Sequence, residues 1–406
     1  MRAVELFAGA GGLAMGVTLA GFRSVAVVEW NQWACDTIRE NQRRAFPIVA
    51  PWPLTEGDVR DFDWSLIPQD IELLAGGPPC QPFSMGGKHR ANDDDRDMFP
   101  ATVHAIRRLR PKAFIVENVR GLTRSSFANY YQYILLQFEF PEISRKKKES
   151  WYEHLMRLQA VKTSSRGHGS SLTYNVAPTV VNAADFGIPQ KRERVFIVGF
   201  RSDLGVEWRF PSATHSEESL LVDQWITGAY WERHRIASRM KPHCSDRLKT
   251  RLRALAESGL SSGERPWVTV RDALVDLPDP TSRRCADVAD HRYQPGARIY
   301  PGHTGSPLDQ PAKAIKAGDH GVPGGENMMV IPRKGVRYFT VRETARLQTF
   351  PDGYLFHGSW SEAMRQLGNA VPVALARLVA ASVAEKLIAA DATDRVNLTS
   401  AIRGAA

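Results

Sequence analysis

Cysteine is scarce in this sequence, and its four cysteines are far apart. Cys35, Cys80, Cys244 and Cys285 form no C-x-x-C pair among 406 residues. This spacing predicts neither a disulfide framework nor a ribbon-type zinc site. We therefore expect a protein of a reducing cytoplasm that holds no metal.

Long uncharged apolar segments are also missing. No stretch is long enough to cross a bilayer, and the N-terminus enters the apolar run 3–7 without the basic region of a secretory signal. We expect neither membrane insertion nor secretion.

Acidic residues are outnumbered by basic ones. Lysine and arginine total 53 against 44 for aspartate and glutamate, which gives a net charge of +9. Such an excess favours a polyanionic partner, although charge alone is a weak signal. The length and a hydrophobic content of 43% allow one large core and a second, smaller one.

Short apolar runs alternate with helical patterns through the first half of the chain. Strands are expected at residues 4–7, 24–29, 71–75, 113–117 and 195–200, and helices at 12–20, 32–41 and 101–109. This alternation predicts an α/β fold with a doubly wound, mostly parallel sheet, whose ligands gather at the carboxyl ends of the strands.

The pattern changes after these elements. Residues 201–336 are rich in proline, glycine, arginine and tryptophan and lack clean alternation. We expect a catalytic and cofactor-binding domain at 1–200, a smaller loop-rich domain at 201–336, and a C-terminal return to the first domain at 337–406. Residues 144–169, with three consecutive lysines and a helical stretch, are interpreted as a surface insertion.

A glycine-rich segment, Phe7-Ala8-Gly9-Ala10-Gly11-Gly12, joins the first expected strand to the first helix. Glycines there permit a tight turn and let a ligand approach the backbone at a helix N-terminus. With Ala14 the segment also fits the G-x-G-x-x-A pattern of dinucleotide-binding proteins. Taken alone, it indicates a nucleotide-like site or a plain structural turn equally well.

Acidic residues lie near the ends of two further loops. Glu29 ends the second strand, where a carboxylate can accept hydrogen bonds from ribose hydroxyls, and Trp30 offers a face for adenine. Asp58, followed by Val59, lies where a third loop can meet an exocyclic amine. An acid at a strand end is more often a solvated loop residue or a helix cap.

The most specific motif is Gly76-Gly77-Pro78-Pro79-Cys80-Gln81-Pro82-Phe83-Ser84. It follows an expected strand, so Cys80 should emerge at the ligand edge of the sheet on a turn stiffened by prolines. A cysteine is most often an inert buried side chain, but this setting favours a reactive one. The polar segment 86–96 is typical of a mobile loop over a site, or of an exposed loop alone.

Two charged motifs should reach the same edge. Glu117 ends a buried strand, where a partly desolvated carboxyl group can hold a proton near neutral pH and give it to a ring nitrogen. The run from Gln190 to Arg194 precedes the last strand. Such a run is usually a solvated turn, but a guanidinium there can also bind a carbonyl oxygen or a phosphate.

In this order, the motifs resemble the DNA cytosine-5 methyltransferases, and the match extends to Gln366-Leu367-Gly368-Asn369-Ala370-Val371-Pro372. The resemblance implies a class I methyltransferase fold with S-adenosylmethionine as methyl donor. It implies that Cys80 is the nucleophile toward a flipped-out cytosine, that Glu117 contacts the N3 edge, and that Arg194, helped by Arg192, holds the ring oxygen.

The resemblance also implies the remaining roles. Residues 342–348 are mainly structural, the second domain reads the target sequence, and Ser84 and Arg96 contact DNA. The cofactor site is lined by Phe7, Ala8, Gly9, Ala10, Gly11, Gly12, Glu29, Trp30, Asp58, Val59, Pro79, Asn369 and Val371. We expect a monomer that acts on double-stranded DNA and does not bind a membrane. We expect it to belong to a restriction-modification system without forming a stable complex with the cognate endonuclease. The alternative is a methyltransferase with no endonuclease partner.

Three rival interpretations stay open. A nicotinamide-dependent dehydrogenase fits the glycine pattern but leaves the Pro-Pro-Cys turn unexplained. A catalytically inert DNA-binding regulator fits the charge but not the complete set of Cys80, Glu117 and Arg194. An RNA methyltransferase with the same catalytic machinery is disfavoured by the large second domain.

Overall fold

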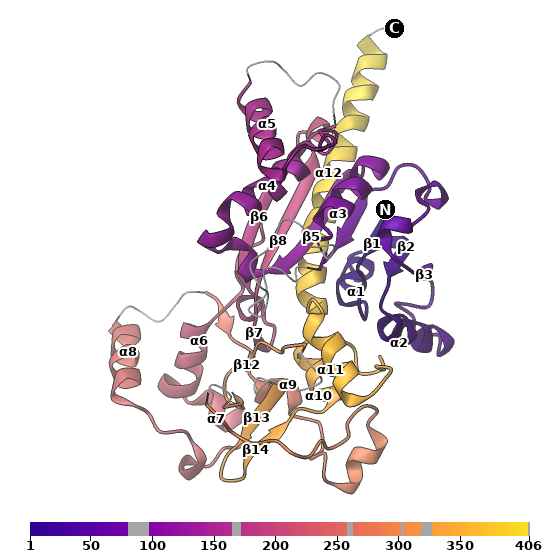
Figure 1. The fold of residues 1–406 in the computed structure, drawn as a ribbon. Coiled ribbons are helices and arrows are strands. Elements are labelled where there is room, and N and C mark those ends of the chain that lie inside the picture. Colours follow the sequence, from indigo (N-terminus) through magenta and orange to yellow (C-terminus); the bar gives the residue numbers. More distant parts are fainter. Residues whose placement is uncertain (80–96, 165–171, 258–262, 302–303, 318–326, 405–406) are drawn as a thin grey trace. The chain divides into compact units, whose positions relative to one another are not determined.

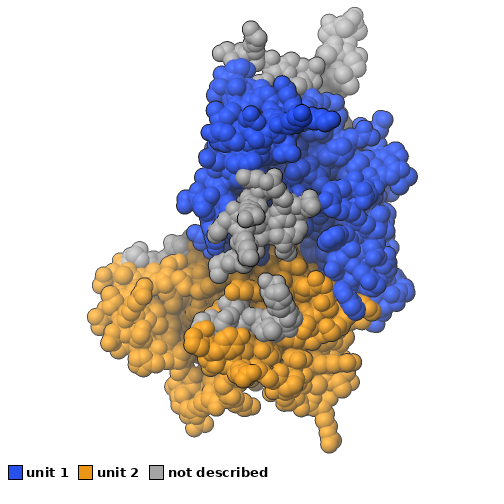
Figure 2. Space-filling view, viewed as in Figure 1, with its two compact units in different colours: residues 1–181, 193–211, 376–406 blue, residues 182–192, 212–375 orange. Residues whose placement is uncertain are grey.

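The computed structural model describes residues 1–79, 97–164, 172–257, 263–301, 304–317 and 327–404. The chain forms two compact units, coloured separately in Figure 2. Unit 1 comprises residues 1–181, 193–211 and 376–406, and unit 2 comprises residues 182–192 and 212–375. Within the described ranges, no helix combines the length and apolarity needed to span a membrane.

Unit 1 is built on a seven-stranded sheet with the order β3-β2-β1-β4-β5-β8-β6 (Figure 1). The strands are β1 (Arg2–Leu6), β2 (Arg23–Glu29), β3 (Leu54–Glu56), β4 (Leu73–Gly76), β5 (Ala113–Val119), β6 (Tyr174–Asn182) and β8 (Glu193–Arg201). The first five strands pair in parallel, and β8 runs antiparallel to β5. The predicted mostly parallel sheet is therefore confirmed.

The sheet is apolar on both faces because helices cover it, as parallel strands require. The helices that belong to unit 1 are α1 (Gly12–Leu19), α2 (Gln32–Arg43), α3 (Phe99–Leu109), α4 (Ala128–Glu139), α5 (Trp151–Thr163) and most of α12 (Val373–Gly404). Val4, Leu74 and Phe114 share one hydrophobic core with side chains of α3, α4 and α5. A Cβ added to Gly16 of α1 would lie 2.3 Å from the Cβ of Ala376, so α1 and α12 pack in close contact.

Unit 2 contains short elements linked by long loops. Its strands are β7 (Gln190–Lys191), β9 (His215–Ser216), β10 (Arg265–Pro266), β11 (Ser306–Pro307), β12 (Ala312–Lys313), β13 (Met328–Ile331) and β14 (Gly335–Tyr338). Its helices include α6 (Glu217–Leu221), α7 (Ala229–Arg233), α8 (Asp246–Glu257), α9 (Val270–Leu274), α10 (Val341–Leu347) and α11 (Trp360–Asn369). Tyr230, Trp231 and Trp267 form the centre of one small core in this unit.

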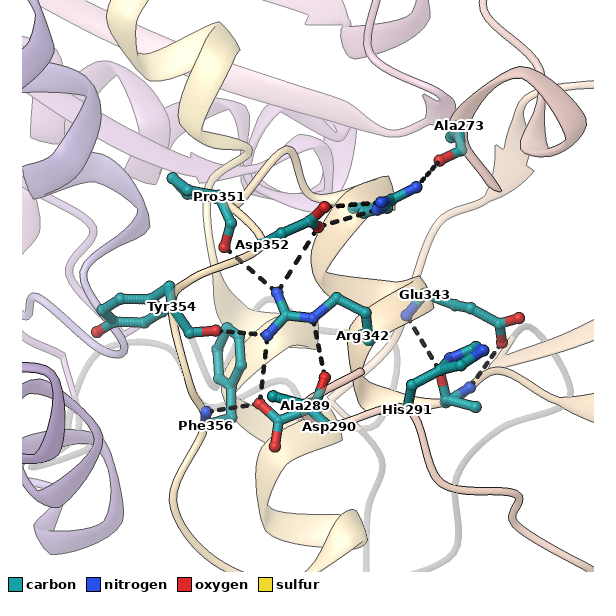
Figure 3. Close-up of polar contacts among 12 residues, drawn as sticks. Ala273, Ala289, Asp290, His291, Arg342, Glu343, Pro351, Asp352, Tyr354 and Phe356 are labelled. Atoms are coloured by element: carbon teal, nitrogen blue, oxygen red, sulfur yellow. Dashed lines mark hydrogen bonds and ion pairs between the residues drawn. The ribbon is translucent and has the colours of Figure 1, made fainter. Parts of the chain in front are cut away.

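A buried arginine organises part of unit 2 (Figure 3). The fully buried guanidinium of Arg342 donates to the carbonyl oxygens of Ala289 at 3.1 Å, Pro351 at 3.3 Å and Tyr354 at 2.8 Å. Burial lowers the pKa of Arg342, and the nearby carboxylates of Asp290 and Asp352 act in the opposite direction. Arg342 thus ties the segment that carries Ala289 to the loop that carries Pro351 and Tyr354.

The contacts divide the chain at positions other than 200 and 336. Residues 337–375 group with unit 2, because Arg342 of α10 holds loop segments of that unit and α10 contacts α9. Residues 182–192 also belong to unit 2, and the chain re-enters unit 1 at residue 193. The assignment of residues 201–336 to target recognition stays a prediction.

Candidate active site

The turn after β1 has an unusual backbone. Phe7, Gly9 and Gly11 have φ angles of 54°, 54° and 88°. For Phe7 this left-handed conformation is strained, and such strain persists only where surrounding structure enforces it. A Cβ added to Gly9 would meet nothing within 4 Å, so this glycine is needed for its conformation and leaves open space beside the backbone. Gly11 is the N-cap of α1 and brings no capping side chain.

The carboxylate of Glu29 fastens this turn to the end of β2. It accepts hydrogen bonds from the backbone N–H groups of Gly9 at 2.7 Å, Trp30 at 3.0 Å and Asn31 at 2.8 Å. Burial raises the pKa of Glu29, while these three hydrogen bonds favour its charged form. A carboxylate has about four acceptor positions, so Glu29 keeps capacity for a ligand hydroxyl.

An exposed aromatic side chain stands beside Glu29. Trp30 is 71% exposed, although a tryptophan usually buries its ring. The next residue, Asn31, caps α2 by accepting a hydrogen bond from Ala34 N–H at 3.1 Å, which fixes where the helix begins. An exposed indole next to a carboxylate fits the adenine and ribose of a nucleoside.

The third predicted loop follows β3. The Gly57 N–H donates to the carbonyl of Glu29 at 2.9 Å, which joins this loop to the end of β2. Asp58 caps the 3₁₀ helix Val59–Asp61 and accepts from the Arg60 N–H at 2.8 Å and from Arg60 Nε at 3.0 Å. These bonds to Arg60 lower the pKa of Asp58. The capping role is thus present, and a ligand amine would share this carboxylate with Arg60.

The Gly-Gly-Pro-Pro turn is held from two sides. A Cβ on Gly76 would lie 2.9 Å from the Leu6 carbonyl oxygen, and one on Gly77 would lie 3.3 Å from Glu117 Oε2. The Asn118 side-chain amide donates to the Pro78 carbonyl at 3.0 Å, while its own oxygen accepts from the Val119 N–H at 2.8 Å. Asn118, which directly follows Glu117, therefore anchors the turn that leads into Cys80.

Several predicted residues lie at or beyond the limits of the described chain. Pro79 is exposed at the end of the turn. Cys80, Ser84 and Arg96 lie outside the described residues.

Glu117 and Arg194 form an ion pair beside the turn. The pairing of β5 with β8 places Arg194 opposite Val119, and Arg194 Nε lies 2.8 Å from Glu117 Oε1. Their side chains are only 13% (Arg194) and 9% (Glu117) exposed. Burial lowers the pKa of Arg194, and the charge of Glu117 opposes that effect. A guanidinium and a carboxylate held this way can together bind a polar ring edge.

Arg192 has different partners from Arg194. Its guanidinium is fully buried in unit 2 and donates to the carbonyls of Ile315 at 2.8 Å, Gly368 at 2.5 Å and Ala370 at 3.1 Å. Arg192 thereby holds the segment that carries Asn369, which ends α11 and is exposed. Val371, in the same segment, is buried. The helping role of Arg192 and the cofactor roles of Asn369 and Val371 stay predictions.

Comparisons with known proteins point to one family. A family model described as C-5 cytosine-specific DNA methylase matches residues 1–141 and 168–385, so the segment 142–167 has no counterpart in it. Type II methyltransferase M.NgoFVII of Neisseria gonorrhoeae is 29% identical over 378 residues, covering 91% of this chain and 83% of that protein. Type II methyltransferase M.Eco47II of Escherichia coli is 29% identical over 391 residues, covering 95% and 79%.

A solved structure supports the fold. The Dnmt2 methyltransferase of S. pombe aligns with a TM-score of 0.53 at 16% identity and covers 95% of this chain and 99% of its own. Because the family model matches most of the chain, this protein belongs to the C-5 cytosine-specific DNA methylases, which transfer a methyl group from S-adenosylmethionine to carbon 5 of cytosine in DNA.

Proposed function

We propose that this enzyme methylates one cytosine within a specific duplex DNA sequence and that Cys80 is its covalent nucleophile. The observation that carries the proposal is the buried pair of Glu117 and Arg194, set beside the anchored Pro78-Pro79 turn from which Cys80 follows directly. A reactive thiol and two groups that bind a polar ring edge are the parts that this chemistry needs.

Carbon 5 of cytosine is a weak nucleophile, so electrons have to enter the ring from elsewhere. In the proposed route the Cys80 thiolate bonds to carbon 6, and Glu117 and Arg194 hold the N3 and O2 positions where negative charge collects. Carbon 5, made nucleophilic by this addition, would accept the methyl group. Loss of the carbon 5 proton to a base would then let Cys80 leave with its electron pair. A free cysteine has a pKa of about 8.5, so positive charge such as that of Arg194 favours the thiolate.

The cofactor fits the edge formed by β1, β2 and β3. The open backbone at Gly9, the remaining acceptor capacity of Glu29 and the exposed face of Trp30 suit the methionine, ribose and adenine portions in turn. S-adenosylmethionine, when bound there, supplies the methyl group. Phe7 and Gly11 set the shape of the turn, and Val59 closes the third loop as a buried side chain.

The target base has to leave the double helix, because stacked neighbours cover carbon 6 and both ring faces. We assign Ser84 and Arg96 to contacts with the opened strand, and residues 201–336 to reading the target sequence. The two Type II methyltransferase relatives support a restriction-modification role. We further propose that the enzyme is a cytoplasmic monomer that forms no stable complex with a cognate endonuclease.

Replacement of Cys80 tests the proposal. Bisulfite sequencing of DNA from cells that express the chain identifies the target, and the purified enzyme is then offered duplex DNA and structured RNA. We expect Cys80→Ala to lose methylation of duplex DNA while its affinity for S-adenosylmethionine stays within about twofold of wild type. Retained turnover would refute the covalent route, and methylation of RNA in preference to DNA would refute the substrate assignment.

A further inference from the structure

The segment 142–167, which the family model does not match, is a packed part of unit 1 through its described residues 142–164. Its helix α5 lies against α4 (Figure 1), and Leu155 and Leu158 are buried in the main core of the unit. The Trp151 ring lies 5.6 Å from that of Tyr130 and 5.8 Å from that of Tyr133, centroid to centroid. The segment is therefore fixed to the catalytic unit.

Polar contacts reinforce this attachment. The Tyr133 hydroxyl and His154 Nδ1 are hydrogen-bonded at 2.9 Å, and His154 Nε2 bonds to the Ile143 carbonyl at 2.8 Å. Burial lowers the pKa of His154, which favours the neutral ring that this arrangement uses. Ser150 and Glu153 form a capping box that starts α5. These bonds join the segment to itself and to α4, both within unit 1.

The segment also packs on a residue next to the catalytic motif. Tyr130, which contacts Trp151, donates its hydroxyl hydrogen to Asp97 Oδ2, and Asp97 Oδ1 accepts from the Phe99 N–H at 3.1 Å at the start of α3. Asp97 is the first described residue after the stretch that begins with Cys80. The extra segment thus lies on the flank of unit 1 from which the chain enters α3.

Four consecutive basic residues, Arg145 to Lys148, form an exposed turn within this segment. Glu149 fixes the turn, because its carboxylate accepts from the Lys146 N–H at 2.7 Å and from Arg157 at 2.8 and 2.9 Å. Arg157 in turn donates to the Ser144 carbonyl at 2.7 Å. Across the described part of the chain, the side chains of residues 145–148 form no ion pair or hydrogen bond. The backbone is thus held while four cationic side chains face solvent.

We propose that Arg145, Lys146, Lys147 and Lys148 form an auxiliary contact for the phosphate backbone of duplex DNA. The inference rests on the proposed function, because it assumes that duplex DNA is the substrate. A fixed turn with four exposed cations suits a linear polyanion, since each contacted phosphate releases condensed counterions. A contact of this kind increases the affinity for DNA without reading bases. It therefore adds to the sequence-specific binding that we assign to residues 201–336.

The test compares two variants that lose equal charge from unit 1. The first is Lys146→Ala/Lys147→Ala/Lys148→Ala. The control is Arg23→Ala/Arg44→Ala/Lys386→Ala, which removes three exposed cations that lie on β2, after α2 and on α12. Both sets are exposed, so both variants should keep the wild-type melting temperature. The readout is the affinity for a duplex that extends well beyond the target site, measured over a range of salt concentrations.

We expect the lysine variant to bind more weakly and to show a shallower slope of log affinity against log salt, by about 0.9 for each phosphate that it no longer neutralises. Near 0.1 M salt this corresponds to roughly a tenfold weaker affinity per phosphate. The rate constant at saturating DNA and the affinity for S-adenosylmethionine should stay at wild-type values, because no removed side chain lies in the proposed site. The control should match the wild-type slope.

Two results would overturn the inference. The first is a lysine variant whose affinity and slope equal those of the control, while both still methylate duplex DNA. The second is binding of the wild type to phosphatidylserine vesicles that the lysine variant loses while its DNA binding is unchanged, which would assign the turn to a lipid surface. If the wild type fails to methylate duplex DNA at all, the proposed function itself fails, and this outcome is separate from both.

Discussion

Glu5 places a carboxyl group in the middle of the catalytic sheet, and its titration makes the stability of unit 1 depend on pH. The residue lies on β1, is 1% exposed, and its Oε1 has no hydrogen-bond partner among the described residues. Burial raises the pKa of Glu5 from 4.5 to about 8. Between these values the folded protein holds a proton that the unfolded chain releases, so stability is full below about pH 4.5 and falls as pH rises toward about 8.

The size of this effect follows from the two pKa values of Glu5, 4.5 and about 8. Each pKa unit corresponds to about 1.4 kcal/mol, so the complete loss is on the order of 5 kcal/mol. Glu5→Gln keeps nearly the same shape but cannot ionise. We expect this variant to gain stability over wild type progressively from about pH 5 to about pH 8, and then to keep a constant advantage.

Urea unfolding followed by circular dichroism at several pH values measures this difference. The matched control is Glu385→Gln, because Glu385 is exposed on α12. Its stability should follow wild type at every pH. A Glu5→Gln variant whose advantage does not grow between about pH 5 and about pH 8 would refute the reasoning about the buried carboxyl group.

Two further predictions concern the site. Asn118→Ala removes the hydrogen bond to the Pro78 carbonyl, so the turn before Cys80 should loosen. We expect kcat to fall by roughly 10- to 100-fold, in line with about 1–3 kcal/mol for a buried polar group left without a partner. Single-turnover methylation measures this rate, and an unchanged kcat would contradict the anchoring role. Trp30→Ala removes the exposed indole, and we expect the Kd for S-adenosylmethionine to rise about tenfold while the affinity for DNA is unchanged. Calorimetry measures the Kd, and equal Kd values for the variant and the wild type would show that Trp30 does not bind the cofactor.

The sequence was sufficient to predict the buried central strands. The predicted runs fall on β1, β2, β4, β5 and β8, because each is a short apolar stretch covered on both faces. The same criterion missed β3 and β6. β3 has three residues, of which two are exposed, and β6 mixes exposed and buried positions. Neither strand therefore has the continuous apolar sequence that predicts a buried strand.

The site could be predicted only as a set of motifs. Arg192 and Arg194 are two residues apart, and the structure gives each guanidinium its own partner: Arg192 donates to the Ile315 carbonyl and Arg194 pairs with Glu117. The joint role expected for the two arginines stays a prediction. Pairing of Arg194 with Glu117 depends on the antiparallel register of β8 with β5, which no local pattern encodes. The hydrogen bond from Asn118 to Pro78 spans 40 residues and is equally invisible to local patterns.

Trapping on a modified base tests the central claim most directly. Duplex DNA with 5-fluorocytosine at the target position blocks the final elimination, because fluorine cannot leave as a proton does. With S-adenosylmethionine present, we expect a protein–DNA adduct that survives denaturation, maps to Cys80 by mass spectrometry and is absent from Cys80→Ala. An enzyme that methylates ordinary DNA but forms no such adduct, or forms it at another residue, would contradict the account.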